Sequence, residues 1–469
     1  MQSYEEIIAA KERYAPASGF DAEVNEDWLF PFQRHIVRWA LAGGRRAVFA
    51  DTGLGKSRMQ LAWADRVARH TGGRVLILAP LAVGPQTVRE AATVGLGGVV
   101  FARSPAESGD ARIVVSNYDN LDKWDGVEFA GVVLDESSIL KSYMGATKRA
   151  LMERFADTPF KLAATATPAP NDHLELGNHA EWLGILSSHQ MIARWFINDS
   201  GEAGKYRLKG HAVRSFWDWV ASWAICVGVP SDIGPYADDG YVLPALRLHR
   251  HIVQVDLREG AKEGALFRLG ELSATSIHRE RRITAPEKAA KVADLVLGES
   301  HEPWLVWCDT NYEAEEVTAR LGGAAVNLYE VAGDMHPDVK SERLLRFAEG
   351  RPGDVLLTKP KIAGFGMNYQ RCARCVFMGT SYSYEAFYQT VRRVWRFGQL
   401  REVDVHVVLA VTDQATWDVV SGKAEDHAAM KAHMFAASRR AQARHSSMLD
   451  YHPTHRAALP SFVRTMESP

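Results

Sequence analysis

The stretch RRAVFADTGLGKS, residues 45–57, joins a short apolar run to a glycine-containing turn that ends in Lys56 and Ser57. Residues 47–50 predict a buried strand, and residues 58–68 predict a helix directly after the turn. Glycines let backbone N–H groups face phosphate oxygens, a lysine can reach the β- and γ-phosphates, and a serine hydroxyl can bind Mg²⁺. We therefore predict a phosphate-binding loop. The strict consensus has glycine where this chain has Ala50, so a chance strand and turn is the alternative at this point.

Composition bounds the class of protein. A chain of 469 residues needs two or more cores, and 46% hydrophobic with 24% charged residues is typical of globular proteins. The acidic start MQSYEEIIAAKERY lacks the apolar run of a secretory signal, so we expect a cytoplasmic protein without a membrane segment. The net charge of −2 argues against a basic surface over the whole molecule but leaves room for a basic groove.

Four cysteines do not form a disulfide framework in a chain of this length. Cys372 and Cys375 form a CxxC pair, but no second pair or histidine cluster completes a zinc site. Because Cys375 begins the apolar run CVFMG, we expect core packing for this pair.

Apolar runs without alternation predict strands buried on both faces, and helical segments between them predict a parallel sheet. In the first half these strands cover residues 74–80, 99–102, 112–117, 131–135 and 161–165. The fourth strand ends in Asp135 and Glu136, at the sheet edge where open α/β sheets bind ligands. Two adjacent acids at this edge can have separate roles in nucleotide hydrolysis: Asp135 can hold Mg²⁺, and Glu136 can activate the attacking water. An acidic turn is the simpler alternative for an isolated pair.

A second α/β unit follows, with strands expected at residues 251–255, 304–309, 324–328, 354–357, 375–379 and 403–409. It has no phosphate loop of its own, so it must serve the first unit. Its segment QTVRRVWRFGQ, residues 389–399, places Arg392, Arg393 and Arg396 at near-helical spacing, with Arg393 and Arg396 on one face. Arginines that cross a cleft to a γ-phosphate can stabilise transition-state charge. A solvated basic helix is the alternative.

Between residues 172 and 244 the alternation is lost and tryptophans accumulate. Phe216, Trp219, Val220 and Trp223 follow helical spacing and predict a helix with one apolar face. We favour core packing for the tryptophans over base stacking. The basic stretch 205–214 is the better nucleic-acid candidate, and the proline- and glycine-rich residues 227–244 predict a linker.

The ordered set AxTGxGKS, DExx, TATP and QxxxRxxRxGQ, with FQ upstream, resembles superfamily-two helicases and translocases, and the last pattern resembles their Swi/Snf-like group. Ala50 is what that family's loop normally carries. The chain departs from the family at DESS, at Arg392 and at Pro360. Together with KGHA and FWDW, these departures resemble bacteriophage or prophage members.

The resemblance implies roles for individual residues. It implies that the catalytic residues are Lys56, Asp135, Glu136, Arg393 and Arg396, and that Ser57 and Asp135 bind Mg²⁺. ATP binding falls to Gln33, which reads adenine, and to Thr52, Gly53, Leu54, Gly55, Lys56, Ser57, Gly366, Arg393 and Arg396. Nucleic-acid contacts fall to Pro80, Ser116, Asn117, Lys361 and Asn368, and coupling between hydrolysis and movement to Thr165, Thr167 and Gln389.

We predict an α/β fold of two RecA-like parallel-sheet lobes in tandem with a helical insertion between them. The expected domains are residues 1–185 (first motor lobe), 186–246 (aromatic-rich insertion and linker), 247–422 (second motor lobe) and 423–469 (C-terminal helix and tail). The expected function is an ATP- and Mg²⁺-dependent DNA translocase or helicase. Duplex DNA is favoured, single-stranded DNA is possible and RNA is less favoured, with replication, repair or defence proteins as possible partners. The alternatives are a strand-separating or RNA-stimulated helicase and a nucleic-acid-binding ATP switch.

Overall fold

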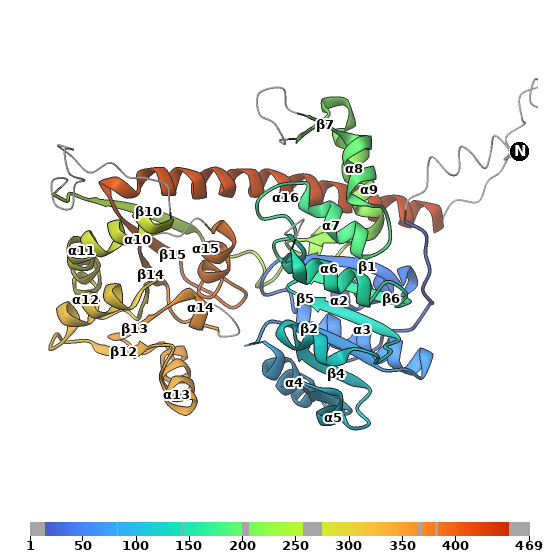
Figure 1. Cartoon of the computed structure of the whole chain (residues 1–469), viewed down its shortest axis with the longest axis horizontal. Helices are drawn as coiled ribbons and strands as arrows, with labels where there is room; N and C mark the ends of the chain where they lie inside the picture. The colour runs from blue at the N-terminus through green and yellow to red at the C-terminus, as the bar shows by residue number, and fades with distance from the viewer. Residues whose placement is uncertain are drawn as a thin grey trace, which may run out of the picture.

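Two parallel β-sheets, each covered by helices on both faces, form the two lobes of the computed structural model (Figure 1). The structure describes residues 15–81, 83–141, 145–198, 206–256, 274–363, 368–379 and 383–449. The predicted fold class, two RecA-like parallel-sheet lobes in tandem, is confirmed.

The first lobe is built on a seven-stranded sheet of order β3-β4-β2-β5-β6-β1-β9. Its strands are β1 (Arg45–Ala50), β2 (Val75–Ala79), β3 (Val99–Phe101), β4 (Ile113–Asn117), β5 (Gly131–Asp135), β6 (Phe160–Thr165) and β9 (Ala224–Val227). All six strands predicted in this half are present, because runs buried on both faces are apolar at every position.

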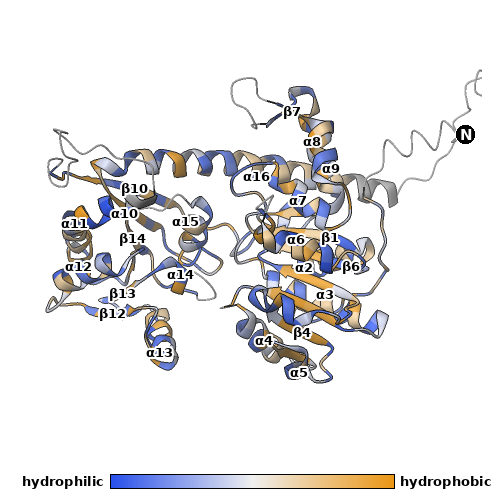
Figure 2. Cartoon of the chain, in the orientation of Figure 1, coloured by the Kyte–Doolittle hydropathy of each residue, from blue (hydrophilic) through white to orange (hydrophobic). Residues whose placement is uncertain are grey.

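Alternate strand residues face two separate cores. One core packs α2 (Pro31–Gly43) and α3 (Lys56–Thr71) on the sheet, next to α4 (Gly84–Thr93). The other core packs α6 (Ala146–Arg154), α7 (Glu175–Trp182) and α9 (Val213–Trp223) on the opposite face. Figure 2 shows the hydrophobic colour concentrated on the strands of this lobe. The remaining short elements of the lobe are α5 (Pro105–Ser108), η1 (Tyr118–Trp124) and η2 (Ser137–Lys141).

The aromatic-rich segment belongs physically to the first lobe. It contains α8 (Ser188–Trp195), the hairpin β7 (Phe196–Asn198) and β8 (Tyr206–Leu208), η3 (Gly210–Ala212), α9, β9 and η4 (Pro230–Asp232). Strand β9, expected within the insertion and linker, instead pairs with β1 as an edge strand of the first sheet. The tryptophans are buried, as expected for core packing: Trp182, Trp195, Trp217, Trp219 and Trp223 are each at most 6% exposed.

The second lobe has a six-stranded parallel sheet of order β10-β15-β14-β11-β13-β12. Its strands are β10 (Leu246–Val253), β11 (Trp304–Trp307), β12 (Asn327–Val331), β13 (Asp354–Thr358), β14 (Arg374–Met378) and β15 (Val403–Ala410). Its helices are α10 (Ala274–Ile283), α11 (Ala285–Gly298), α12 (Asn311–Leu321), α13 (Pro337–Ala348), α14 (Pro360–Ala363) and α15 (Tyr384–Val391), followed by η5 (Val411–Asp413).

Two details of this lobe concern the predictions. Strand β12 begins three residues later than expected, because Ala324 still hydrogen-bonds back to Leu321 in the turn after α12. Cys372 and Cys375 are buried in the core, which confirms their packing role.

The C-terminal helix α16 (Gln414–Leu449) is 36 residues long and begins nine residues before the C-terminal segment expected at residues 423–469. At 1.5 Å per residue it measures about 54 Å. It contacts α9 and β9 of the first lobe and α15 of the second, and Figure 1 shows it lying along both lobes. None of the helices in the described ranges has the length and apolar character that a bilayer crossing requires.

Candidate nucleotide site

The loop of residues 51–55 connects β1 to α3 and needs glycine at two positions. Gly53 and Gly55 have φ values of +95° and +79°, which side chains other than glycine rarely adopt. A Cβ atom on Gly55 would lie 2.3 Å from Nε2 of Gln33, and one on Gly53 would lie 3.0 Å from Cβ of Phe397. Backbone conformation and close neighbours therefore both explain the glycines that the sequence shows.

Gln33 lies near the start of α2 and is only 2% exposed. Its Nε2 donates to the carbonyl oxygen of Leu54 at 2.8 Å, and its Oε1 accepts from the backbone N–H of Phe30 at 2.9 Å. In this conformation the amide therefore holds the phosphate loop against α2. Its role in reading adenine stays a prediction.

Lys56 and Ser57 occupy the first turn of α3, whose amino end presents backbone N–H groups. The ammonium of Lys56 donates to the carbonyl oxygen of Ala50 at 2.9 Å. Burial lowers the pKa of this lysine, although the negative charges of Glu136, Asp135 and Asp51 oppose the shift. An anion in the loop would stabilise the charged form of this lysine.

Asp135 ends β5 and Glu136 follows in a left-handed backbone conformation, φ 54°. Oδ1 of Asp135 accepts a hydrogen bond from Nε2 of Gln60 at 2.6 Å. Burial, with the charge of Glu136, raises the pKa of the Asp135 carboxyl to about 6. Thr165 donates its hydroxyl to Oε2 of Glu136 at 3.2 Å, which orients the carboxylate.

Arg393 and Arg396 come from the second lobe. Helix α15 ends at Val391, so the arginines lie in successive turns after it and not on the helix that their spacing suggested. Burial lowers the pKa of Arg393, and the charge of Glu136 opposes that shift. Nε of Arg393 is buried without a hydrogen-bond partner. Burial, together with its neighbouring arginines, lowers the pKa of Arg396 to about 10.

The lobes meet at Glu385 of α15. Its Oε1 accepts from the Thr167 hydroxyl and from Nε2 of Gln389, each at 3.4 Å, and its carboxylate pairs with Lys141 of the first lobe. Thr167 in turn donates its backbone N–H to Thr165 Oγ1 at 3.1 Å. A chain of polar contacts thus runs from the second lobe to Glu136.

Several contacts around the site were not predicted from the sequence, among them those of Gln60 and Asp51. Gln60 and Tyr118 hold Asp135, the first through its carboxylate and the second through its carbonyl oxygen at 2.7 Å. Asp51 contacts Tyr388, Arg392 and Lys431 from distant parts of the chain. Asp51 lies inside the phosphate loop, but only the tertiary structure shows which residues it contacts.

The residues fit a triphosphate with Mg²⁺. Lys56 and Arg393 are half-buried cations with lowered pKa values, and the Nε atom of Arg393 is buried without a hydrogen-bond partner. Asp135 is a buried carboxylate whose ionised form a divalent cation would favour, and Ser57 would supply a hydroxyl ligand. Thr52 and Leu54 line the loop through their backbones, since their carbonyl oxygens accept from Arg392 and Gln33. Gly366 lies outside the described residues.

The predicted nucleic-acid residues fall into two groups. Lys361 and Asn368 are exposed and Pro80 is partly exposed, so these positions are accessible. Ser116 is fully buried and accepts a hydrogen bond from Trp124 Nε1 at 3.1 Å, and Asn117 is 2% exposed. The Ser116 hydroxyl is therefore used inside the core, and the nucleic-acid contacts expected at Ser116 and Asn117 stay predictions.

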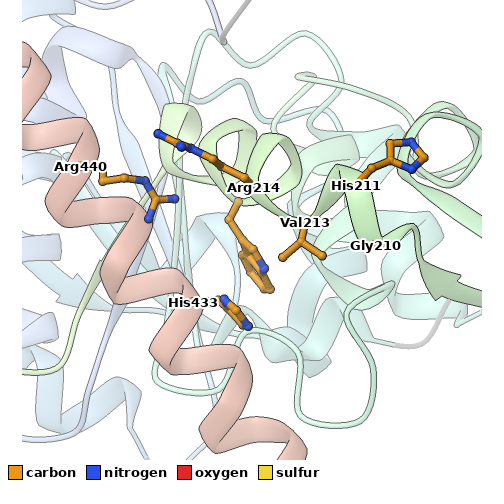
Figure 3. A pocket seen from close by; sticks show the side chains of 7 residues that line it. Gly210, His211, Val213, Arg214, His433 and Arg440 are labelled. Carbon is orange, nitrogen blue, oxygen red and sulfur yellow. The ribbon is translucent and has the colours of Figure 1, made fainter.

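A pocket of about 470 Å³ lies between the start of α9 and helix α16 (Figure 3). Arg214 and Arg440 both contact the carboxylate of Asp218, and Trp217 stacks on His433 with ring centroids 5.8 Å apart. The lining includes part of the basic stretch singled out in the sequence: Gly210, His211, Val213, Arg214, Trp217, His433 and Arg440.

Residues 287–398, within the second lobe, match the family model of the helicase conserved C-terminal domain. This match covers part of the second of two parallel α/β lobes in tandem. Among solved structures, the chain is similar to the Sulfolobus solfataricus SWI2/SNF2 ATPase core in complex with dsDNA. The identity is 15%, the TM-score is 0.40, and the likeness covers 90% of this chain and 96% of that chain. No curated protein matches the chain.

Proposed function

We propose that the protein is a nucleic-acid-stimulated ATPase that uses closure of its lobes on MgATP to move along DNA, with duplex DNA as the favoured substrate. The unpartnered, buried Nε of Arg393 carries this proposal. A buried guanidinium nitrogen without a hydrogen-bond acceptor costs free energy, and a phosphate oxygen between the lobes would supply that acceptor.

The chemistry assigned to the chain follows from the site. Glu136, oriented by Thr165, accepts a proton from the attacking water. Lys56 of the first lobe and Arg393 and Arg396 of the second offset the charge that develops on the transferred phosphoryl group. Mg²⁺, held by Ser57 and Asp135, would neutralise charge between the β- and γ-phosphates.

Dependence on nucleic acid follows from the position of the arginines. Because they belong to the second lobe, hydrolysis requires that lobe to be seated on the first, and nucleic acid bound across both lobes would favour this state. Lys361 and Asn368, with the basic residues beside α9, are the proposed contacts. A cytoplasmic site of action, a phage origin, and replication, repair or defence partners remain predictions.

The test compares ATP hydrolysis by the full chain with no polymer, single-stranded DNA, duplex DNA, forked DNA and RNA at fixed salt, because phosphate contacts make affinity salt-dependent. We expect duplex DNA to stimulate hydrolysis most. Slow turnover that no polymer stimulates would favour an ATP switch, and stimulation by RNA alone would overturn the DNA assignment.

Two substitutions test the chemistry. Lys56→Ala and Glu136→Gln should each lower kcat by at least about 100-fold, since each removes a group that acts on the phosphoryl transfer. Circular dichroism should show a folded protein in both cases. Activity close to that of the unaltered chain in either variant would contradict the proposed site.

A further inference from the structure

Four side chains from three segments meet at the start of the phosphate loop. The Asp51 carboxylate accepts a hydrogen bond from the Tyr388 hydroxyl of α15. It also pairs with Arg392 (Nη2 to Oδ1, 3.4 Å) and with Lys431 of α16 (Nζ to Oδ2, 3.2 Å). Arg392 further donates to the carbonyl oxygen of Thr52 at 2.9 Å. The second lobe and the C-terminal helix therefore both hold the loop directly.

The cluster is largely removed from water. The side chains of Arg392, Lys431 and Asp51 are 6%, 15% and 17% exposed. Lys431 also donates to the Tyr388 hydroxyl at 2.8 Å, and the Arg392 guanidinium lies 4.9 Å from the centre of the Trp395 ring. Burial would raise the pKa of Asp51, but Lys431 and Arg392 hold it well below its usual value. Charge pairs in such surroundings are screened little by salt.

The position of Arg392 in the chain gives the cluster a consequence for the reaction. Arg392 directly precedes Arg393, and the turns that follow it carry Arg396. A contact that fixes Arg392 to Asp51 and Thr52 thus fixes the two arginines relative to the phosphate loop. Misplacement of a catalytic group by about 1 Å can cost about 100-fold in rate.

We propose that Asp51, Tyr388, Arg392 and Lys431 form an interlobe clamp that seats Arg393 and Arg396 on the phosphate loop, and that α16 takes part in catalysis through Lys431. The four members are positioning residues. The proposal rests on the proposed ATPase function and adds to it a third structural element, the C-terminal helix.

The charges of the clamp predict an order of effects. Two cations share one carboxylate, so Lys431→Met leaves the Asp51–Arg392 pair intact. Asp51→Asn instead leaves two buried cations without a carboxylate, which is the costlier defect. Removing Lys431 from the Asp51→Asn protein should relieve part of that cost, so the double variant should be more active than Asp51→Asn alone.

The experiment measures kcat and KM for ATP at saturating duplex DNA. We expect kcat to fall about 10-fold in Lys431→Met and about 100-fold in Asp51→Asn, with KM changed less than about threefold. Lys431→Arg should recover most of the rate. The matched control is Lys423→Met on the same helix, because Lys423 bonds to Asn171 of the first lobe at 3.0 Å and does not contact the loop. Its rate should stay within about twofold of that of the unaltered protein.

A structural role alone predicts different readouts. If the variants were merely unstable, fluorescent ADP would bind more weakly in parallel with the loss of kcat. For a clamp that positions the arginines, ADP affinity should change less than about threefold. Equal rates in all variants, an equal loss in Lys423→Met, or a double variant whose losses multiply would overturn the clamp.

Failure of the proposed function gives a separate result. A protein that hydrolyses no ATP with any polymer is not the ATPase proposed above. The clamp is then decided by small-angle X-ray scattering of the nucleotide-free chain. The radius of gyration should increase in Asp51→Asn and not in Lys423→Met, and an unchanged radius would reject the clamp.

Discussion

Replacing Asp135 by asparagine should make the nucleotide-free protein more stable while removing its activity. The carboxyl is 5% exposed, and burial together with the charge of Glu136 raises its pKa from 3.8 to about 6. The ionised form that MgATP requires is therefore a destabilised form of the free protein. Asparagine has almost the same shape and can still accept the hydrogen bond from Gln60.

The magnitude follows from the two pKa values. They differ by about 2.2, which at about 1.36 kcal/mol per pKa unit corresponds to about 3 kcal/mol. A carboxyl whose pKa is raised by folding destabilises the protein fully above the folded pKa, near pH 6, and not at all below the unfolded value of 3.8. We therefore expect Asp135→Asn to gain about 3 kcal/mol at pH 7, about half of that at pH 5, and little below pH 4.

The assay is urea denaturation followed by tryptophan fluorescence at pH 7 and pH 5, with the change in midpoint multiplied by the slope m. Adding MgATP should reverse the order at pH 7, because bound ligand stabilises only the protein that retains its carboxylate. The reasoning is refuted if Asp135→Asn is no more stable than the unaltered chain at pH 7. It is also refuted if the difference between the two proteins is the same at both pH values.

Two further predictions concern the loop and the pocket. Gly55→Ala should lower the free energy of unfolding by about 2–3 kcal/mol, because alanine is strained in a left-handed conformation and its Cβ atom would displace the Gln33 amide. The same change should weaken nucleotide binding. Gly72→Ala, φ +68° with nothing within 4 Å, is the control, and its thermal melting should show only the smaller strain cost. Arg214→Ala should raise the DNA concentration for half-maximal ATPase stimulation about threefold or more, with the DNA-free rate unchanged. Arg320→Ala also removes an i,i+4 ion pair but lies on α12, away from the pocket, and should have no such effect. Equal effects of the two substitutions would exclude the pocket as a DNA-binding site.

Much of the fold was accessible from the sequence because its signals are local. Strands buried on both faces are uninterrupted apolar runs, and a phosphate loop needs glycine, lysine and serine within a few residues. The predicted start of a strand was wrong where the preceding turn has a composition similar to that of the strand, as at residues 324–326 before β12. Strand β9 was missed because its assignment to the first sheet depends on a pairing with β1, across more than 170 residues of chain.

The candidate site divides in the same way. Lys56 was predicted because it belongs to the glycine-containing turn after a strand, and Asp135 and Glu136 because they lie at the end of one. The arginines were predicted from a short pattern. Nothing near Ser116 in the sequence shows that Trp124 Nε1 donates to the Ser116 hydroxyl in the core.

By itself, the sequence determined that two parallel α/β lobes form and that the first carries a phosphate loop with two acids at the strand ends. These features depend on residue type and spacing within short segments. Only the tertiary structure decided that Asp51 meets Arg392 and Lys431, and that the Nε atom of Arg393 is buried without a hydrogen-bond partner. The physical reason is that charge pairing and burial depend on distances between segments hundreds of residues apart, which no local pattern encodes.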